Sequence, residues 1–232
     1  MSKIPYCLPL RCNTFQELEH TIQQHDTQFR FFEIWLDALQ ALSPRSLVKL
    51  AEAYPQRLIF LFRRDQLAPM RIPAEQRRIL MQTLQFYDVL IDLDIQHQRE
   101  DIQWWQDHAP PEKLLLSAHD YQCTPEPVKL QELVQTMQAI PSGIYKVATF
   151  CNDYNDTQRL MQLILEGPQL WNGKPSVILG MGQAGQATRI FGTLMGNALL
   201  FAPRSRNQAT ANGQHTYAEY QTLFALLAPD YA

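Results

Sequence analysis

The sequence lacks the features that mark several classes of protein. It has 20 lysines and arginines against 23 aspartates and glutamates, so no basic excess indicates a nucleic-acid-binding protein. The four cysteines form no CxxC pair and have no zinc-ligand spacing. No apolar run is long enough to span a membrane, and the first residues, MSKIPYCLPL, lack the apolar stretch of a signal peptide. We therefore expect a cytoplasmic protein with reduced thiols, no metal, and neither nucleic acid nor membrane as a partner.

Glycine is also scarce, with 9 residues in 232. The segment GMGQAG at 180–185 matches a dinucleotide-binding pattern weakly, and it comes late, whereas a Rossmann fold would carry that pattern after its first strand. Hydrophobic residues, in contrast, make up 46% of the chain, which is enough for one large domain or two small ones.

Short apolar segments recur along the whole chain and have the length of strands. Most are apolar at successive positions, which is typical of parallel strands covered on both faces. The expected strands are 6–12, 30–38, 57–64, 88–95, 113–120, 143–150, 176–182 and 198–203.

Amphipathic segments with helical periodicity lie between the expected strands. Thr14 with Glu17 predicts a capping box at the first helix, and Ser43 with Pro44 predicts the start of the second. Eight strands that start about 22 to 33 residues apart, with no linker between them, predict an α/β fold, a (β/α)8 TIM barrel forming a single domain over 1–232. The expected helices are 14–24, 43–54, 74–87, 99–109, 126–140, 155–167, 186–197 and 216–228.

Polar residues follow or end several of these strands. In a barrel, reactive side chains sit at the carboxyl ends of the strands, so these positions are the candidates for a site. They are Glu33, Asp37, Arg63, Asp92, Asp94, His119, Asp120 and Lys146, with Arg189 after the seventh strand.

Lys146 stands in the middle of the apolar segment GIYKVATF. Its ordinary role would be to reach water at the strand end or to pair with a carboxylate. Alternatively, apolar surroundings favour the neutral amine, which can attack a ketone and form a Schiff base. The resulting iminium is an electron sink that acidifies the adjacent carbon.

His119 lies in LLLSAHDYQCTP, on the strand before that of Lys146. It could simply bind backbone near a loop. It could also act as a general acid and base, oriented by Glu33 or by a group from a loop. Neighbouring strands would then bring His119 and Lys146 together at one site.

Arg63 and Arg189 are candidates for binding an anionic substrate, because a guanidinium group forms paired hydrogen bonds to a carboxylate or to hydroxyls. Either could instead make a surface ion pair. The polar loop 203–217 fits a lid, to which Thr210 and Gln214 could contribute hydrogen bonds, or it is merely mobile.

Several segments, in chain order, resemble the type I 3-dehydroquinate dehydratases. SAHDYQCTP resembles the family's S-x-H-D-F-x-x-T-P, and IYKVATF resembles its strand with the Schiff-base lysine. GMGQAGQATRIFGTLMGNALLFA resembles S-M-G-x-x-G-x-x-S-R-x-x-G-x-x-x-G-S-x-x-T-F. FEIWLDAL, LIFLFRR and ATANGQ resemble its second strand, third strand and closing loop. These matches cover nearly the whole chain.

The resemblance implies a hydro-lyase of the shikimate pathway, in aromatic amino acid biosynthesis, that converts 3-dehydroquinate to 3-dehydroshikimate. It implies that Lys146 forms the Schiff base, that His119 is the general acid and base, and that Arg189 binds the substrate carboxylate. It implies no dissociable cofactor. The residues implied to hold hydroxyl groups and close the site are Glu33, Arg63, Thr210 and Gln214.

The family is often dimeric, so the resemblance also implies a homodimer. The segment REDIQWWQDHA could supply an apolar contact through Trp104 and Trp105, unless one of them faces the core.

The chain departs from the family pattern in three places. Trp35 stands where the family has an arginine, which removes a donor to the substrate. Leu67 stands where the family has a glutamate that supports the histidine, a role that Asp65 or Arg64 could take over. Asn212 replaces a proline of the closing loop.

These departures leave two alternatives open. One is a Schiff-base lyase or aldolase-like enzyme acting on a related keto acid. The other is a catalytically weak homologue that serves as a binding or scaffolding protein, since a fold does not determine function.

Overall fold

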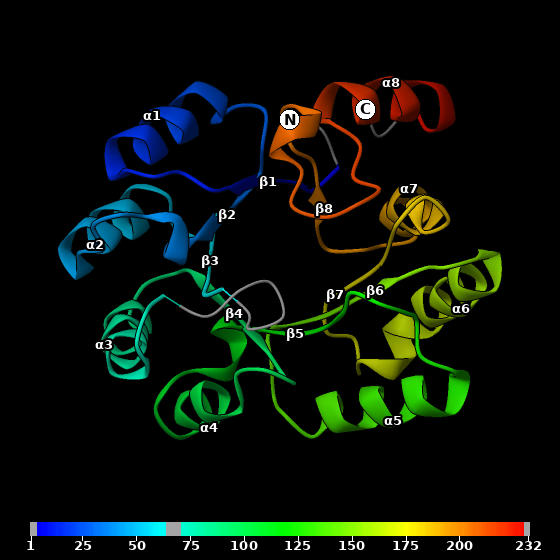
Figure 1. Ribbon diagram of the computed structural model, residues 1–232, viewed down its shortest axis with the longest axis horizontal. Helices are drawn as coiled ribbons and strands as arrows, with labels where there is room; N and C mark the ends of the chain where they lie inside the picture. The colour runs from blue at the N-terminus through cyan, green and yellow to red at the C-terminus, as the bar shows by residue number, and fades with distance from the viewer. Residues whose placement is uncertain (1–3, 64–70, 230–232) are drawn as a thin grey trace.

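The apolar segments form eight parallel strands at the centre of the molecule, and helices surround them in a ring (Figure 1). The computed structural model describes residues 4–63 and 71–229. The strand order is β7-β6-β5-β4-β3-β2-β1-β8. The sheet curls until its two edges meet, where the amide of Ala198 donates to the carbonyl of Ser176 over 2.8 Å. The predicted α/β barrel class is therefore confirmed.

The elements lie in the order and near the positions expected from sequence, but β2, β3 and β8 are each several residues shorter than expected. The strands are β1 (Tyr6–Leu10), β2 (Phe31–Trp35), β3 (Leu58–Leu61), β4 (Leu90–Asp94), β5 (Leu114–Asp120), β6 (Ile144–Phe150), β7 (Ser176–Met181) and β8 (Leu200–Phe201). The helices are α1 (Phe15–His25), α2 (Pro44–Ala53), α3 (Ala74–Leu84), α4 (Arg99–His108), α5 (Pro127–Gln138), α6 (Tyr154–Leu170), α7 (Gln186–Leu194) and α8 (Tyr217–Leu227).

The first two helices begin where the sequence predicted, but their capping hydrogen bonds match the prediction only in part. The hydroxyl of Thr14 accepts the amide of Glu17 over 3.1 Å, as a capping box requires. The Glu17 carboxylate, however, accepts the amide of Asn13 instead of that of Thr14. Ser43 precedes α2 without a side-chain cap, so Pro44 at the first turn carries that start.

Alternate residues of each strand pack into two different cores. In β6, Tyr145 and Val147 belong to the large core between sheet and helices, whereas Ala148 belongs to a smaller one inside the barrel. Because side chains alternate along a strand, Lys146 lies on the same face as Ala148 and points into the barrel. The inner core consists of Cys7, Ile59, Leu115, Ala148, Val177, Leu179, Met181, Leu199 and Phe201.

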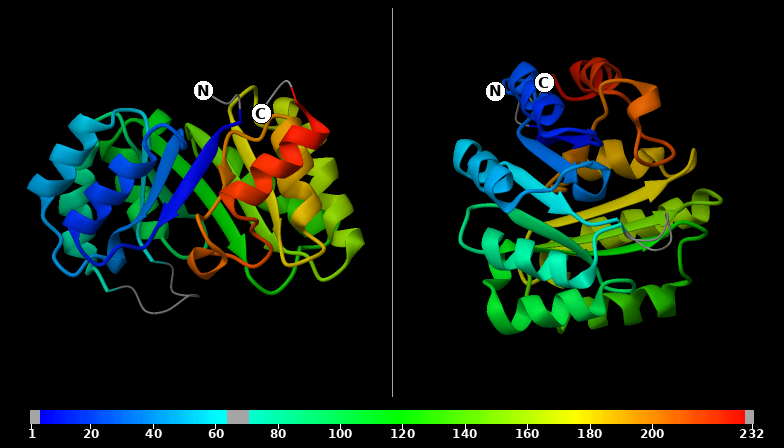
Figure 2. Two further views of the ribbon diagram at one scale, coloured as in Figure 1. Left: turned by 90° about the horizontal axis from the view of Figure 1, so that it is seen from above. Right: turned by 60° about the vertical axis from the view of Figure 1, so that its left-hand side comes forward.

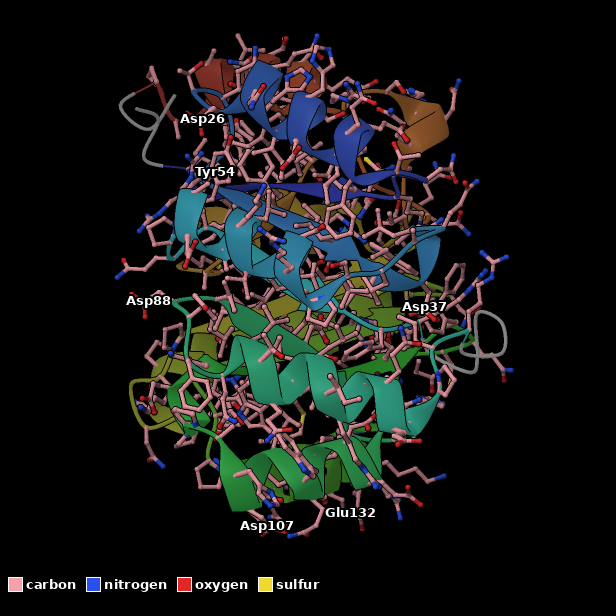
Figure 3. All side chains as sticks on the ribbon, turned by 90° about the vertical axis from the view of Figure 1, so that its left-hand side faces the viewer. Asp26, Asp37, Tyr54, Asp88, Asp107 and Glu132 are labelled. Atoms are coloured by element: carbon pink, nitrogen blue, oxygen red, sulfur yellow. The ribbon has the colours of Figure 1, made fainter. Side chains whose placement is uncertain are left out.

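The two ends of the barrel differ in character. Asp26, Tyr54 and Asp88 precede strands and lie along one side of Figure 3, whereas Asp37, which follows β2, lies on the opposite side. The strands run in one direction between these ends (Figure 2). Inward polar side chains therefore gather at the end where the strands finish, and apolar ones fill the interior below.

The tryptophan pair of α4 divides between core and surface. Trp105 is buried, and its indole donates to the carbonyl of Pro110 over 3.1 Å. Trp104 is partly buried and stacks on His108, with ring centroids 4.7 Å apart. The homodimer stays a prediction.

Two simple properties accompany the fold. None of the helices in residues 4–63 and 71–229 is long and apolar enough to cross a membrane. All four cysteines are free thiols.

The last helix, α8, begins with a full capping box. The hydroxyl of Thr216 accepts the amide of Glu219 over 3.3 Å, and the Glu219 carboxylate accepts the amide of Thr216 over 2.8 Å. That backbone hydrogen bond, helped by Arg206, lowers the pKa of Glu219 from 4.5 to about 2. The ionised carboxylate therefore stabilises the fold above the unfolded pKa, and this stabilisation is lost as the pH falls toward 2.

We predict that Glu219→Gln lowers the free energy of unfolding at pH 7 by about 0.5–1 kcal/mol, as expected for a partly exposed capping contact. The difference from wild type should narrow between pH 5 and pH 3, as measured by urea denaturation. Glu132→Gln, at an exposed position of α5, is the control and should show no such trend. A difference for Glu219→Gln that stays constant down to pH 3 would contradict this account.

Candidate active site

Lys146 is buried inside the barrel and is bound by two carboxylates. Its Nζ donates to Oε1 of Glu33 over 3.0 Å and to Oδ2 of Asp92 over 2.9 Å. The three residues are 5%, 3% and 0% exposed, respectively. An ammonium group taken out of water costs several kcal/mol unless partners compensate, and here two carboxylates do so. Lys146 therefore does not reach bulk water, and of its two ordinary roles the ion pair is the one present.

The contacts of Lys146 form one layer of the barrel interior. Glu33 comes from β2, Asp92 from β4 and Lys146 from β6. The ring of Phe201 in β8 also contacts the ammonium group, with its centroid 4.4 Å from Nζ. Alternate strands of a closed barrel contribute side chains at a common level, so this layer follows directly from the register.

A second group holds His119. Its Nδ1 lies 2.8 Å from Oδ2 of Asp94, whose other oxygen lies 2.7 Å from Nδ1 of His97. A carboxylate only accepts, so the proton of this contact belongs to Nδ1 of His119. Asp94 therefore orients the imidazole, which the sequence had suggested for Glu33 or a loop group; Glu33 contacts Lys146 and Trp35 instead.

Ser117 links neighbouring strands at this level. It lies in register with Lys146 on one side and with Asp94 on the other. Its hydroxyl donates to Oδ1 of Asp92 over 2.5 Å, so Asp92 binds Ser117 with one oxygen and Lys146 with the other. Sequence reasoning missed Ser117, although its inward position on β5 could have indicated it.

These groups open into a cavity of about 410 Å³, the space at its mouth included. Six of the seven residues predicted from sequence to form the site line this cavity, and Arg63 does not. The lining consists of Glu33, Trp35, His119, Tyr121, Lys146, Ala148, Leu179, Met181, Arg189, Phe201, Thr210, Ala211 and Gln214.

Arg189 brings a second positive charge to the cavity from α7. It is 2% exposed, and its Nε donates to the carbonyl of Gly180 over 3.1 Å. Burial lowers the pKa of Arg189, since water no longer solvates the guanidinium ion. Its buried Nη2 has no hydrogen-bond partner among the residues that the structure describes. An unmet donor of this kind is costly, so the position suits an anionic ligand.

The glycine-rich segment 180–185 serves packing, not nucleotide binding. A Cβ added at Gly180 would lie 2.7 Å from Cα of Gly185 and 2.6 Å from Sγ of Cys151. Only glycine allows the end of β7 to touch the turn before α7. This close approach brings the first turn of α7, and with it Arg189, over the end of the sheet.

The loop after β8 lies over the cavity. Its Gln214 accepts the amide of Thr210 over 2.8 Å through Oε1, and both residues line the cavity. The carbonyl of Asn212 accepts the amide of Gly182 over 3.1 Å, which fastens the loop to the turn after β7. The loop therefore lies where a lid would close over the cavity. Its opening and closing stay a prediction.

Arg63 follows the end of β3 and binds Asp37 through its backbone. Its amide donates to Asp37 over 2.6 Å, and the same carboxylate accepts the amides of Arg71 over 2.9 Å and Ile72 over 3.3 Å. Asp37 thus joins the two sides of segment 64–70 and has a structural role. The departure expected at Leu67, with Asp65 or Arg64 as substitutes, lies outside the described residues.

Trp35 has an unexpected partner. Its indole nitrogen donates to Oε2 of Glu33 over 3.2 Å, and its ring lines the cavity. The guanidinium carbon of Arg11 lies 4.0 Å from the centroid of that ring. Arg11 was not singled out from sequence, because a single arginine after a strand resembles any surface arginine.

A barrel that gathers a buried lysine, an imidazole and a guanidinium around one cavity at the carboxyl ends of its strands defines an α/β-barrel enzyme with a lysine–carboxylate centre. The sequence profile of the family described as type I 3-dehydroquinase matches residues 6–230. The chain belongs to this family of hydro-lyases.

Individual relatives agree with the family. The 3-dehydroquinate dehydratase of Coxiella burnetii (strain CbuK_Q154) is 25% identical over 224 residues, which cover 94% of this chain and 91% of the relative. That of Methanocaldococcus jannaschii is 26% identical over 212 residues, covering 90% and 92%.

Solved structures of similar enzymes share the fold. A type I 3-dehydroquinate dehydratase from Clostridium difficile, crystallised with covalently modified comenic acid, superposes with a TM-score of 0.80 at 18% identity, covering 99% of this chain and 94% of that one. A 3-dehydroquinate dehydratase from Geobacillus kaustophilus gives 0.78 at 19% identity, covering 97% and 91%.

Gly213 offers a test of how the loop is fastened over the cavity. Its φ is +81°, and an added Cβ would lie 2.4 Å from the carbonyl oxygen of Gly182. We predict that Gly213→Ala detaches the loop, so that trypsin cleaves faster at Arg204 and Arg206. The free energy of unfolding should fall by only about 1–2 kcal/mol, because the barrel core is untouched.

Gly173→Ala is the matched control. Gly173 has a φ of +74°, yet an added Cβ would meet nothing within 4 Å. The control therefore carries the backbone strain without the overlap, and its tryptic cleavage rate at 203–217 should equal that of wild type. Equal rates for the two variants would show that Gly182 does not hold the loop.

Proposed function

We propose that this protein dehydrates 3-dehydroquinate to 3-dehydroshikimate through a Schiff base on Lys146, with His119 as the general acid and base. The observation that carries the proposal is the buried Lys146, bound to Glu33 and Asp92, in a cavity that His119 and Arg189 also line. Membership of the family and the names of the relatives support the same reaction.

The carboxylates beside Lys146 suit the first step. The ammonium group must lose a proton before it can attack a ketone, and Asp92 and Glu33 lie 2.9 and 3.0 Å away to accept one. The neutral amine then adds to the substrate ketone, and loss of water gives the iminium ion. The iminium draws electrons from the neighbouring C–H bond, which makes that proton removable.

His119 suits the steps that follow. It accepts the proton from the carbon beside the iminium and returns it to the departing hydroxyl, which leaves as water. Asp94, 2.8 Å from Nδ1, keeps Nδ1 protonated and stabilises the imidazolium that forms in between. Water then hydrolyses the imine, which releases the product and regenerates Lys146.

Arg189 suits the substrate carboxylate, because its buried Nη2 lacks a partner among the described residues and faces a site for an anion. The hydroxyl groups would bind to the remaining polar residues around the cavity. In this proposal they are Glu33, Thr210 and Gln214 from the lining, with Arg63 from the end of β3.

The proposal also covers the catalytic domain, the cellular compartment and the oligomeric state. Residues 1–232 would act as one catalytic domain, in the cytoplasm, as a homodimer. Because Lys146 supplies the covalent chemistry, the reaction needs no dissociable cofactor, and the free thiols agree with a reducing compartment.

The first experiment is to incubate the protein with 3-dehydroquinate, reduce with borohydride and locate the adduct by peptide mass spectrometry, while enone absorbance is followed in parallel. We expect an adduct on Lys146 together with growing absorbance, and neither in Lys146→Ala. An adduct without product would favour a different keto acid as the substrate. Neither adduct nor product would overturn the proposal in favour of a binding protein.

The second experiment separates imine formation from proton transfer. Asp94→Asn removes the carboxylate that orients His119, and we predict a fall in kcat of about 10²–10⁴-fold, as for the loss of an orienting aspartate elsewhere. The borohydride adduct on Lys146 should still form. Asp120→Asn is the control, since Asp120 accepts the amides of Gln122 and Cys123 in the same strand-end region. A kcat near that of the control would remove Asp94 from the mechanism.

A further inference from the structure

Arg11 stands at the end of β1, on the side of the barrel where the cavity opens. Its guanidinium carbon lies 4.0 Å from the ring centroid of Trp35, within the range of a cation–π contact. The structure, over residues 4–63 and 71–229, gives this guanidinium no ion pair and no hydrogen bond. The side chain is exposed, and it carries five N–H donors.

The surroundings of Arg11 belong to the site. Its charge interacts with Glu33 and Tyr121, both of which line the cavity, and with Arg63. The pKa of Arg11 is lowered, first because the surrounding protein removes part of its hydration and then because Arg63 is positive, whereas Glu33 acts in the opposite direction. The guanidinium is thus partly desolvated next to residues that line the cavity, and no carboxylate of residues 4–63 and 71–229 is bound to it.

Trp35 holds Arg11 in place. The indole is itself fixed by its hydrogen bond to Oε2 of Glu33, whose other oxygen binds Lys146. A cation–π contact with this fixed ring restricts the guanidinium group that lies over it. A side chain ordered in advance loses less entropy when a ligand binds.

We propose that Arg11 is a specificity-determining residue that donates hydrogen bonds to the hydroxyl groups of a polyhydroxylated keto acid bound at Lys146. Trp35 is its platform, and together the two residues supply a donor at the β1–β2 side of the cavity. The substrate carboxylate has a separate partner in Arg189. This inference rests on the proposed function and adds a residue to it.

Arg11→Gln tests the proposal in steady-state kinetics with 3-dehydroquinate. We expect KM to rise about tenfold or more while kcat stays within about threefold, because a hydrogen bond from a charged donor is lost and the reacting groups are unchanged. Half-saturation of the borohydride adduct on Lys146 should rise by the same factor. Arg11→Lys keeps the charge without the planar fork and should recover only part of the loss.

A second variant distinguishes binding from a structural role. In Arg11→Gln combined with Trp35→Arg, the guanidinium comes from the neighbouring side chain and reaches the same space, since the two residues are in contact. We expect this double variant to bring KM back toward wild type. Arg45→Gln, at an exposed arginine near the start of α2, is the control and should leave KM unchanged.

The outcomes are separable. Normal wild-type turnover with an unchanged KM in Arg11→Gln overturns this inference alone. Full recovery by Arg11→Lys, or a rise in Arg45→Gln equal to that in Arg11→Gln, would assign the effect to general charge and overturn it as well. Wild-type protein that forms neither adduct nor product would overturn the proposed function, and the inference with it.

Discussion

The placement of one ammonium group inside the barrel governs the rest of the site. Removing Lys146 from water is unfavourable unless carboxylates accompany it, and they must come from strands that are distant along the chain. Glu33 and Asp92 meet this need from β2 and β4, while Phe201 from β8 closes the layer. Side chains from four alternate strands thus meet around one positive charge.

That layer also divides the barrel by polarity. Below it the interior is filled with aliphatic side chains and a cysteine, such as Leu115, Val177 and Cys7, which exclude water. At and above it lie Ser117 and His119, each bound to a carboxylate of β4. The two aspartates of β4 therefore have distinct tasks, since Asp92 serves the lysine and Asp94 serves the histidine.

The sequence allowed the barrel and much of the site to be predicted, because both follow from local patterns. Apolar segments alternating with amphipathic ones indicated the strands and helices, and strand ends indicated Lys146 and His119. Pairings within the interior could not be predicted in this way. They depend on the register of neighbouring strands, and Asp94 pairs with Ser117 in that register, two residues before His119, so Asp94 was not recognised as the partner of His119.

Trp35 and Arg11 show a second limit of the sequence. An aromatic residue in place of an arginine suggested the loss of a hydrogen-bond donor. In three dimensions the ring supports an arginine from the neighbouring strand, 4.0 Å away. The supply of an arginine by the neighbouring strand cannot be recognised from the sequence. Arg11 and Trp35 are far apart along the chain, and no periodicity relates them. The signal that could have found it is the position of Arg11 immediately after β1.

Asp37 has a consequence for how such a barrel can change. Its carboxylate binds amides at 63, 71 and 72, so the two flanks of segment 64–70 are clamped to each other and to the end of β2. Replacements or insertions between the flanks would then leave the strands in place. The sequence of segment 64–70 can therefore change by mutation or by grafting of another loop. Glu33, Asp92 and Lys146 would keep their geometry.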